Sequence, residues 1–231
     1  MEWWSIVTAA IAPGIALLVY FYLKDLYESE PIAMVVRVFL FGVLIVFPTM
    51  VVQRALVLGL GESNLLFAFG ITGFVEEFIK WFVLYFAVLK HSSFDEPYDG
   101  IVYAVSISMG FATLENVIYA LMNHFTLSSL MFRALLPVSG HALFGVMMGY
   151  YMGKAKFGSP SDKSRLLLYA LMIPVFWHGL FDYILLQVST RWIWLMAPLM
   201  VFLWVLSMGK VNRANAKSPF RLVRREEEVK S

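Results

Sequence analysis

The chain of 231 residues contains no cysteine, and only 15% of its residues are charged. The absence of cysteine excludes disulfide bonds, a thiolate nucleophile and any metal site built on cysteine. No basic stripe is present, so no nucleic-acid partner is expected. Instead, 60% of the residues are hydrophobic, whereas soluble domains carry about 45–50% apolar residues. The composition therefore predicts a polytopic membrane protein embedded in the lipid bilayer.

The apolar residues form continuous runs, whereas the strands of a membrane β-barrel alternate apolar and polar residues. About 20 apolar residues suffice for a helix to cross a bilayer. Met1–Leu23 has no basic segment at its start, so we interpret it as a first span and not as a cleavable signal. We expect an all-α transmembrane bundle of about seven spans, the second of which could extend to Leu60. The expected spans are 3–23, 33–53, 64–89, 100–122, 131–152, 166–189 and 191–209.

The basic residues predict the orientation of the bundle. Four of them lie in a segment expected to be a loop, 154–165, and seven more lie in the tail after Gly209. Lys and Arg accumulate on the cytoplasmic side of a membrane, and seven crossings place both segments on the same side. We expect a bacterial cell-membrane protein whose N-terminus is outside. Its transmembrane domain covers 1–209, and a basic cytoplasmic tail covers 210–231.

The third span carries three charges at membrane depth within the stretch GFVEEFIKW, Gly73–Trp81. One such charge costs about 3 kcal/mol to insert, so it is rarely kept for packing alone. Glu76 and Lys80 are four residues apart and share a helix face, whereas Glu77 is turned about 100° away. We expect Lys80 to hold Glu76 and to leave Glu77 as the general base, although helix geometry alone also allows the reverse. The bland alternative is a buried ion-pair cluster that only orients helices.

Later spans carry further polar residues at similar depth: Glu115 with Asn116, then His141, then His178 with Asp182. We counted residues from the outer end of each span, at 1.5 Å of rise per residue. By this count the carboxylates and histidines lie within roughly 10 Å of one another along the membrane normal. Scattered structural residues have no reason to share a layer, so one convergent site is predicted.

Two histidines and several carboxylates suit a divalent metal ion, with Zn²⁺ the first choice and one position left for water. A free glutamate would then take a proton from that water. Without a metal, a glutamate could activate water directly while the histidines stabilise the oxyanion. The candidate catalytic residues are Glu76, Glu77, Glu115 and His178; the supporting residues are Lys80, Asn116 and Asp182; the candidate metal ligands are His141, His178 and Asp182.

Small residues follow His141 at intervals of four, at Gly145, Gly149 and Gly153. Such a stripe on a membrane helix allows a neighbouring backbone to approach closely. We therefore expect this face of the fifth span to pack against another helix.

Four motifs on successive spans, GFVEEFIKW, GFATLEN, GHALFG and WHGLFD, resemble the PrsW family of intramembrane-type proteases. The loop KDLYESEP after the first span is similar to that family as well. The family is related to the CAAX prenyl protease and bacteriocin-immunity superfamily. The resemblance implies a bacterial protease that makes the first, extracytoplasmic (site-1) cut in a membrane-anchored anti-sigma factor. A second protease then cuts within the membrane, and the sigma factor is released.

The chain departs from the CAAX branch of that superfamily at three positions. The FxxxH motif of that branch matches Phe111 to Glu115, so a glutamate replaces the histidine. The second motif, HxxxN or HxxxB, matches His178 to Asp182, with an acid in place of asparagine. Lys80 stands three residues after the second glutamate, where that branch has an arginine four residues after it. These departures add carboxylates, which favours a metal, and they argue against a prenylated substrate.

Two other functions fit the same residues. A layer of Glu, His and Asp in a membrane also suits a proton or cation relay, so a transporter of ions or small molecules is the main alternative. A structural immunity protein that binds a bacteriocin is a third. The glutamates would be dispensable in an immunity protein, and a transporter mutant would lose uptake without affecting the anti-sigma factor.

Overall fold

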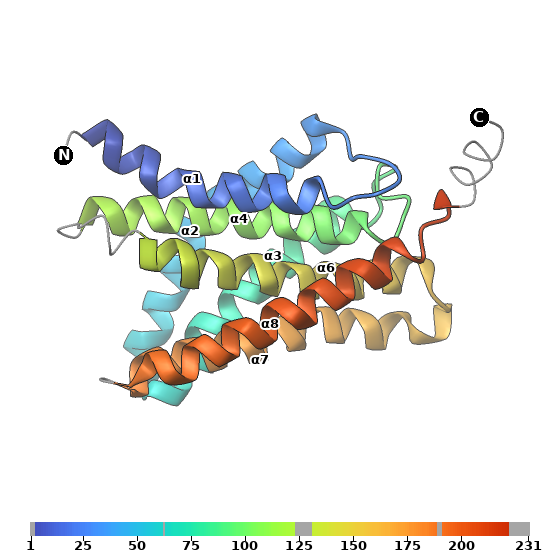
Figure 1. Ribbon diagram of the computed structural model, residues 1–231. Helices are drawn as coiled ribbons and strands as arrows, with labels where there is room; N and C mark the ends of the chain where they lie inside the picture. The colour runs from blue at the N-terminus through green and yellow to red at the C-terminus, as the bar shows by residue number, and fades with distance from the viewer. Residues whose placement is uncertain (1–2, 62, 123–130, 189–190, 222–231) are drawn as a thin grey trace.

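A computed structural model describes residues 3–61, 63–122, 131–188 and 191–221. Within these ranges the protein is helical and contains no strand, which confirms the predicted all-α class. The helices form seven continuous segments (Figure 1). They are α1 (Trp3–Tyr22), α2 (Ile32–Leu60), η1–α3–η2 (Leu66–Phe74, Val75–Val83, Leu84–Val88), α4 (Asp99–Met122), η3–α6 (Ala134–Val138, Ser139–Phe157), α7 (Lys163–Gln187) and α8 (Trp192–Asn215).

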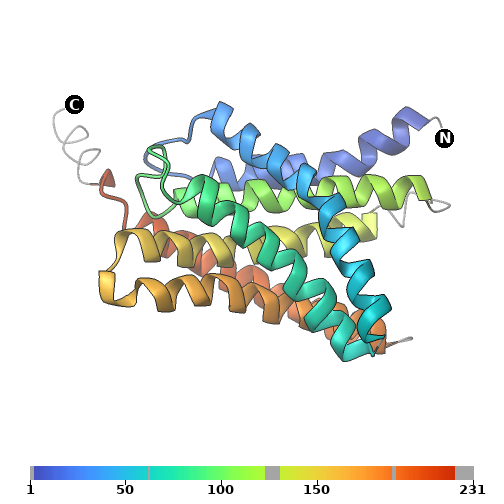
Figure 2. The ribbon, with the colours of Figure 1, turned by 180° about the vertical axis from the view of Figure 1, so that it is seen from behind.

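Successive segments run in alternating directions, so α1 begins at one end of the bundle and α8 ends at the other (Figures 1 and 2). In the described part of the chain, five helices are long and apolar enough to cross a membrane by their length and composition. The protein is therefore a multi-pass membrane bundle. The connection 123–130 and the part of the expected tail after Arg221 lie outside the described residues.

Four helices are longer than their apolar runs. Helix α2 continues past Arg54 to Leu60, as the sequence allowed. The connection expected at 154–165 is present but shorter, because α6 continues to Phe157 and α7 begins at Lys163, with the 3₁₀ turn η4 (Pro160–Asp162) between them. Helix α8 likewise continues to Asn215, into the expected tail. The apolar segments end before the helices do, because a helix can continue through lysine and arginine residues. Their long side chains bury the aliphatic stem along the helix while the charged head group reaches water.

Helix α4 lies at the centre of the bundle and is buried over most of its length. Small residues let its neighbours approach. A Cβ atom added at Gly149 of α6 would overlap the carbonyl of Gly100 on α4, and one added at Gly145 would lie 2.9 Å from the carbonyl oxygen of Ala104. The glycine stripe therefore packs against α4, which confirms the expected close approach of a neighbouring backbone.

Candidate active site

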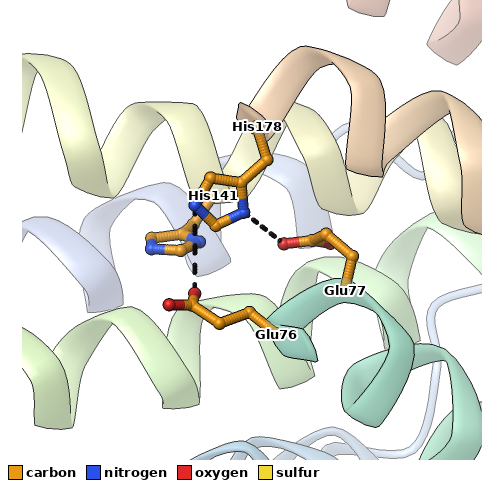
Figure 3. A group of neighbouring side chains, drawn as sticks. All are labelled: Glu76, Glu77, His141 and His178. Atoms are coloured by element: carbon orange, nitrogen blue, oxygen red, sulfur yellow. Dashed lines mark hydrogen bonds and ion pairs between the residues drawn. The ribbon is translucent and has the colours of Figure 1, made fainter. Parts of the chain in front are cut away.

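Four buried side chains from three segments converge in the middle of the bundle (Figure 3). Glu76 and Glu77 come from α3, His141 comes from α6, and His178 comes from α7. One potential ligand atom of each residue lies within 4.8 Å of the corresponding atoms of the other three. The structure thus brings together residues that the chain separates by up to three spans.

Two features of the local sequence allow this convergence. Helix α3 is flanked by the π-helical segments η1 and η2. This wide helical geometry is rare in proteins overall, and where it occurs it often lies at a functional site. Gly73 then packs directly on Gly179, since a Cβ atom at Gly73 would lie 3.0 Å from the backbone nitrogen of Gly179. These two glycines bring the backbones of η1 and α7 together just beside Glu76 and His178.

Lys80 is fully buried and organises the interior of the site. Its ammonium donates to Glu77 Oε1 at 2.8 Å and to His141 Nδ1 at 3.1 Å, and it lies 4.4 Å from the centre of the Phe111 ring. Glu76 Oε2 is a more distant partner at 3.7 Å. The expectation that Lys80 chiefly holds Glu76 is therefore corrected. The lysine must also reach His141 on α6, and this direction brings its head group nearest to Glu77.

His178 is held in one orientation by its neighbours. Its Nδ1 lies 2.9 Å from Glu77 Oε1, and the Phe144 ring stacks on the imidazole at 5.1 Å between centroids. A carboxylate only accepts hydrogen bonds, so Nδ1 carries the proton. The other ring nitrogen, Nε2, consequently faces two carboxylates, with Asp182 Oδ2 at 3.5 Å and Glu76 Oε2 at 3.9 Å.

Both ring nitrogens of His141 are engaged. Lysine is a donor only, so His141 Nδ1 accepts from Lys80, and its Nε2–H donates to Glu115 Oε2 at 3.1 Å. Arg133 Nη2 lies 3.9 Å from the other oxygen of Glu115. His141 is therefore placed as a donor more readily than as a metal ligand, which would require it to give up one of these two bonds.

Asn116 does not join the group. Its Nδ2 donates to the carbonyl of Ala10 on α1, and its Oδ1 accepts from Arg133 Nε, so it ties α4 to α1 beside the site. Asp182 is closer to the centre, and its Oδ2 accepts from Thr72 Oγ1. Sequence reasoning did not select Thr72 or Arg133 for the site, because a single hydroxyl or a span-end arginine carries no spacing signal.

A cavity of about 410 Å³ opens beside the site between α2 and α4. Among its lining residues are Glu76, Glu115, Arg133 and Gln53, together with apolar side chains of both helices. Gln53 Nε2 donates to Glu76 Oε1 at 3.1 Å, a partner that sequence reasoning missed. Glu77 is 0% exposed and does not line this cavity, so Glu76 is the carboxylate of the pair that faces it.

The donor set fits a divalent cation. Glu76 Oε2 and Glu77 Oε2 are buried, and neither has a hydrogen-bond partner among the described residues. Nε2 of His178 faces Glu76 and Asp182, and carboxylate oxygens with a deprotonated imidazole nitrogen are ligands that Zn²⁺ takes. The Glu77 contact to His178 Nδ1 is also the kind of outer hydrogen bond that orients zinc-bound histidines.

The chain is similar to known proteins over most of its length. Residues 30–207 match the family described as PrsW family intramembrane metalloprotease. A protein named Protease PrsW from Geobacillus kaustophilus is 51% identical over 212 residues, which cover 91% of this chain and 92% of that protein. Its namesake from Bacillus subtilis is 48% identical over 92% of this chain and 96% of its own length, and that from Clostridioides difficile is 32% identical over 88% and 89%. No solved structure matches the chain.

The protein is a membrane peptidase, since its helical bundle holds a buried group of glutamates and histidines and its relatives are named as proteases. Specifically, the chain belongs to the PrsW family of intramembrane metalloproteases.

Proposed function

We propose that this peptidase makes the first, extracytoplasmic-side cut in a membrane-anchored anti-sigma factor and so activates a sigma factor. The observation that carries the proposal is the position of Glu76, which belongs to the buried Glu/His group and also lines a 410 Å³ cavity. A peptide segment and a water molecule can meet a carboxylate there. The apolar lining suits the extended, hydrophobic juxtamembrane segment of a membrane-anchored substrate.

In this mechanism Glu76 is the general base. It takes a proton from the attacking water and returns it to the leaving amine, while Gln53 fixes the orientation of its carboxylate. The Nε2–H of His141 supplies a hydrogen-bond donor for the developing oxyanion, and the ammonium of Lys80 supplies positive charge beside it. Glu115 positions His141, and Glu77 positions both Lys80 and His178.

We further propose that the site holds Zn²⁺. His178 Nε2 and Asp182 are the groups that would hold it, with Glu77 and Thr72 orienting them. When bound, Zn²⁺ would supply a Lewis acid and lower the pKa of water toward about 7. Glu76 lies 3.9 Å from His178 Nε2 and lines the cavity, so it would stay free to act as the general base.

The proposed orientation in the bacterial cell membrane has the N-terminus outside and the C-terminus in the cytoplasm. It is supported by the basic ends of α6, α7 and α8, which gather at one end of the bundle, where Lys154, Arg165 and Lys217 line a common cleft. A reporter fused after Ser231 should be active only in the cytoplasm, and one fused near Ser63 only outside. An active external reporter after Ser231 would reject this orientation.

The test of the function is cleavage of an epitope-tagged anti-sigma factor, first in cells and then with both proteins purified in detergent. We expect a truncated product that requires Glu76 and His178. A strain lacking the protein that loses uptake of a solute while the anti-sigma factor is processed normally would instead indicate a transporter. An immunity protein would protect cells from a bacteriocin even with both glutamates replaced.

A further inference from the structure

A second group of carboxylates lies away from the candidate active site, at the end of the bundle where α8 ends. Asp25 belongs to the loop after α1, Glu96 to the loop before α4, and Asp99 is the first residue of α4. One oxygen of each lies within 4.8 Å of the others. Figures 1 and 2 show the two loops, coloured blue and green, side by side although they are far apart in the sequence.

Two of these carboxylates are buried and the third, Asp25, is partly buried. Glu96 and Asp99 are 0% exposed. Neither oxygen of Glu96, nor Asp25 Oδ2, nor Asp99 Oδ1 forms a hydrogen bond of normal geometry in the part of the chain that the structure describes. In that same part, no lysine or arginine nitrogen lies within 4.0 Å of the carboxylates of these three residues. Buried charges are normally paired or coordinate metals. Lys156 interacts with Asp99 only from beyond 4.0 Å, so none of the described lysine and arginine residues contacts the group directly.

Backbone hydrogen bonds hold part of the group in place. Asp99 Oδ2 accepts the backbone N–H groups of Asp95 and Glu96 at 2.7 and 2.6 Å, which folds the loop tightly onto the start of α4. Three carboxylates whose oxygens lie within 4.8 Å of one another repel each other in the absence of a neutralising charge.

An acidic cleft lies next to the group. A cavity of about 320 Å³ between the same two loops is lined by Glu28, Glu30, Asp95 and three serines. Glu30 is itself buried, accepts a hydrogen bond from Tyr103, and interacts electrostatically with Glu96. The carboxylates of Glu28, Glu30 and Asp95 therefore favour cations in this cleft.

We propose that Asp25, Glu96 and Asp99 form a binding site for a hard divalent cation of the Ca²⁺ or Mg²⁺ class, separate from the candidate active site. The ligands are all oxygens, which hard cations prefer. Two oxygens that each lie about 2.4 Å from one Ca²⁺ ion are at most about 4.8 Å apart, which matches the spacing of this group. The absence of histidine from the group disfavours zinc.

A cation bound here would join the loop after α1 to the loop before α4, next to the end of α8. Asn215 at the end of α8 already donates to the Lys24 carbonyl at 3.1 Å and accepts from the Leu26 backbone N–H at 3.2 Å, so α8 is docked on the loop that carries Asp25. Coordination would add the loop before α4 to this joint. The clamp would stabilise one end of the central helix without touching the Glu/His group.

The test uses the full-length protein in detergent, stripped with chelator and dialysed, and then titrated with Ca²⁺ alone and with Mg²⁺ alone. Binding stoichiometry and melting temperature are both measured, for the wild type and for Glu96→Gln. Asp162→Asn, a change of the same kind at a half-exposed surface acid, is the matched control. Glu76→Gln removes a carboxylate charge from the candidate active site, so it separates binding there from binding at the loops.

We expect the wild type, Asp162→Asn and Glu76→Gln to bind one hard cation and to melt at a higher temperature when it is present. Glu96→Gln should bind at least about tenfold more weakly, because affinity for Ca²⁺ follows the number of charged ligands. If Glu96→Gln does not accumulate, Asp25→Asn carries the same test at a less buried position.

Equal binding by Glu96→Gln and the wild type would overturn the proposal. A wild type that binds neither cation would also overturn it. If that wild type in chelator also melted at a lower temperature than Glu96→Gln, the acids would be sharing protons instead of binding a cation. Loss of peptide cleavage in Glu76→Gln with retained cation binding keeps the two proposals separate.

Discussion

Replacing Glu76 by glutamine tests the assignment of the general base most directly. The variant Glu76→Gln is compared with Glu77→Gln and with the surface control Asp162→Asn. Glutamine keeps the volume of glutamate, and its carbonyl can still accept the Gln53 Nε2 hydrogen bond. Lys80 keeps its closer partner Glu77 at 2.8 Å. We therefore expect the free energy of unfolding to change by less than about 1 kcal/mol.

The effect on the rate should be much larger. A positioned general base contributes about 10²–10⁴-fold, which corresponds to about 3–5 kcal/mol in the activation barrier. Glu77→Gln should differ in kind, because it removes the charged partner of the buried Lys80 and of His178. Breaking a buried pair of this type costs about 3–5 kcal/mol of stability, so the yield of Glu77→Gln in the membrane should fall together with its activity.

The assay is the initial rate of anti-sigma factor cleavage at matched concentrations of folded protein in detergent, with melting temperature recorded in parallel. Glu76→Gln should be well folded and inactive, Glu77→Gln poorly folded, and Asp162→Asn normal in both respects. Cleavage at the wild-type rate by folded Glu76→Gln would refute the assignment of Glu76, and normal stability of Glu77→Gln would refute its role in holding Lys80.

Three further outcomes follow from the same contacts. Lys80→Ala should lower the free energy of unfolding by about 3–5 kcal/mol, since it leaves Glu77 buried without its cation. Its yield should therefore be lower than that of Glu76→Gln, and an unchanged melting temperature would contradict this. His178→Ala should abolish cleavage and lower the zinc content of the purified protein, measured by elemental analysis, whereas unchanged zinc would place the metal elsewhere. Gly145→Leu should destabilise the bundle by about 1–3 kcal/mol through overpacking against Ala104, and normal stability would show that the two helices can separate at this point.

The sequence alone determined the fold class and the inventory of the site. A run of about 20 apolar residues must satisfy its backbone hydrogen bonds internally, so its helical state depends on little beyond its own composition. The cost of charge at membrane depth in turn marked Glu76, Glu77 and Lys80 before any contact was known. His141 and His178 could be selected with them because depth along a helix follows directly from residue count.

Only the tertiary structure decided how these residues pair. Lys80 can reach either glutamate along its own helix, at three or four residues' separation, so helix geometry leaves the choice open. The positions of His141 on α6 and His178 on α7 settle it, since both contacts favour Glu77 as the fixed carboxylate and leave Glu76 toward the cavity. Helix rotation and interhelical distance are properties of the packed bundle, which a single span does not encode.

The same limit applies to Asn116 and to the acidic loops. Asn116 is adjacent to Glu115, yet a rotation of about 100° per residue turns it toward α1, and only the neighbouring helix shows what it meets there. Asp25 and Glu96 are ordinary loop acids in the sequence, where acidic residues are usually solvated. Their burial arises because α4 and the end of α8 bring two distant loops together, and that arrangement depends on long-range packing and not on local composition.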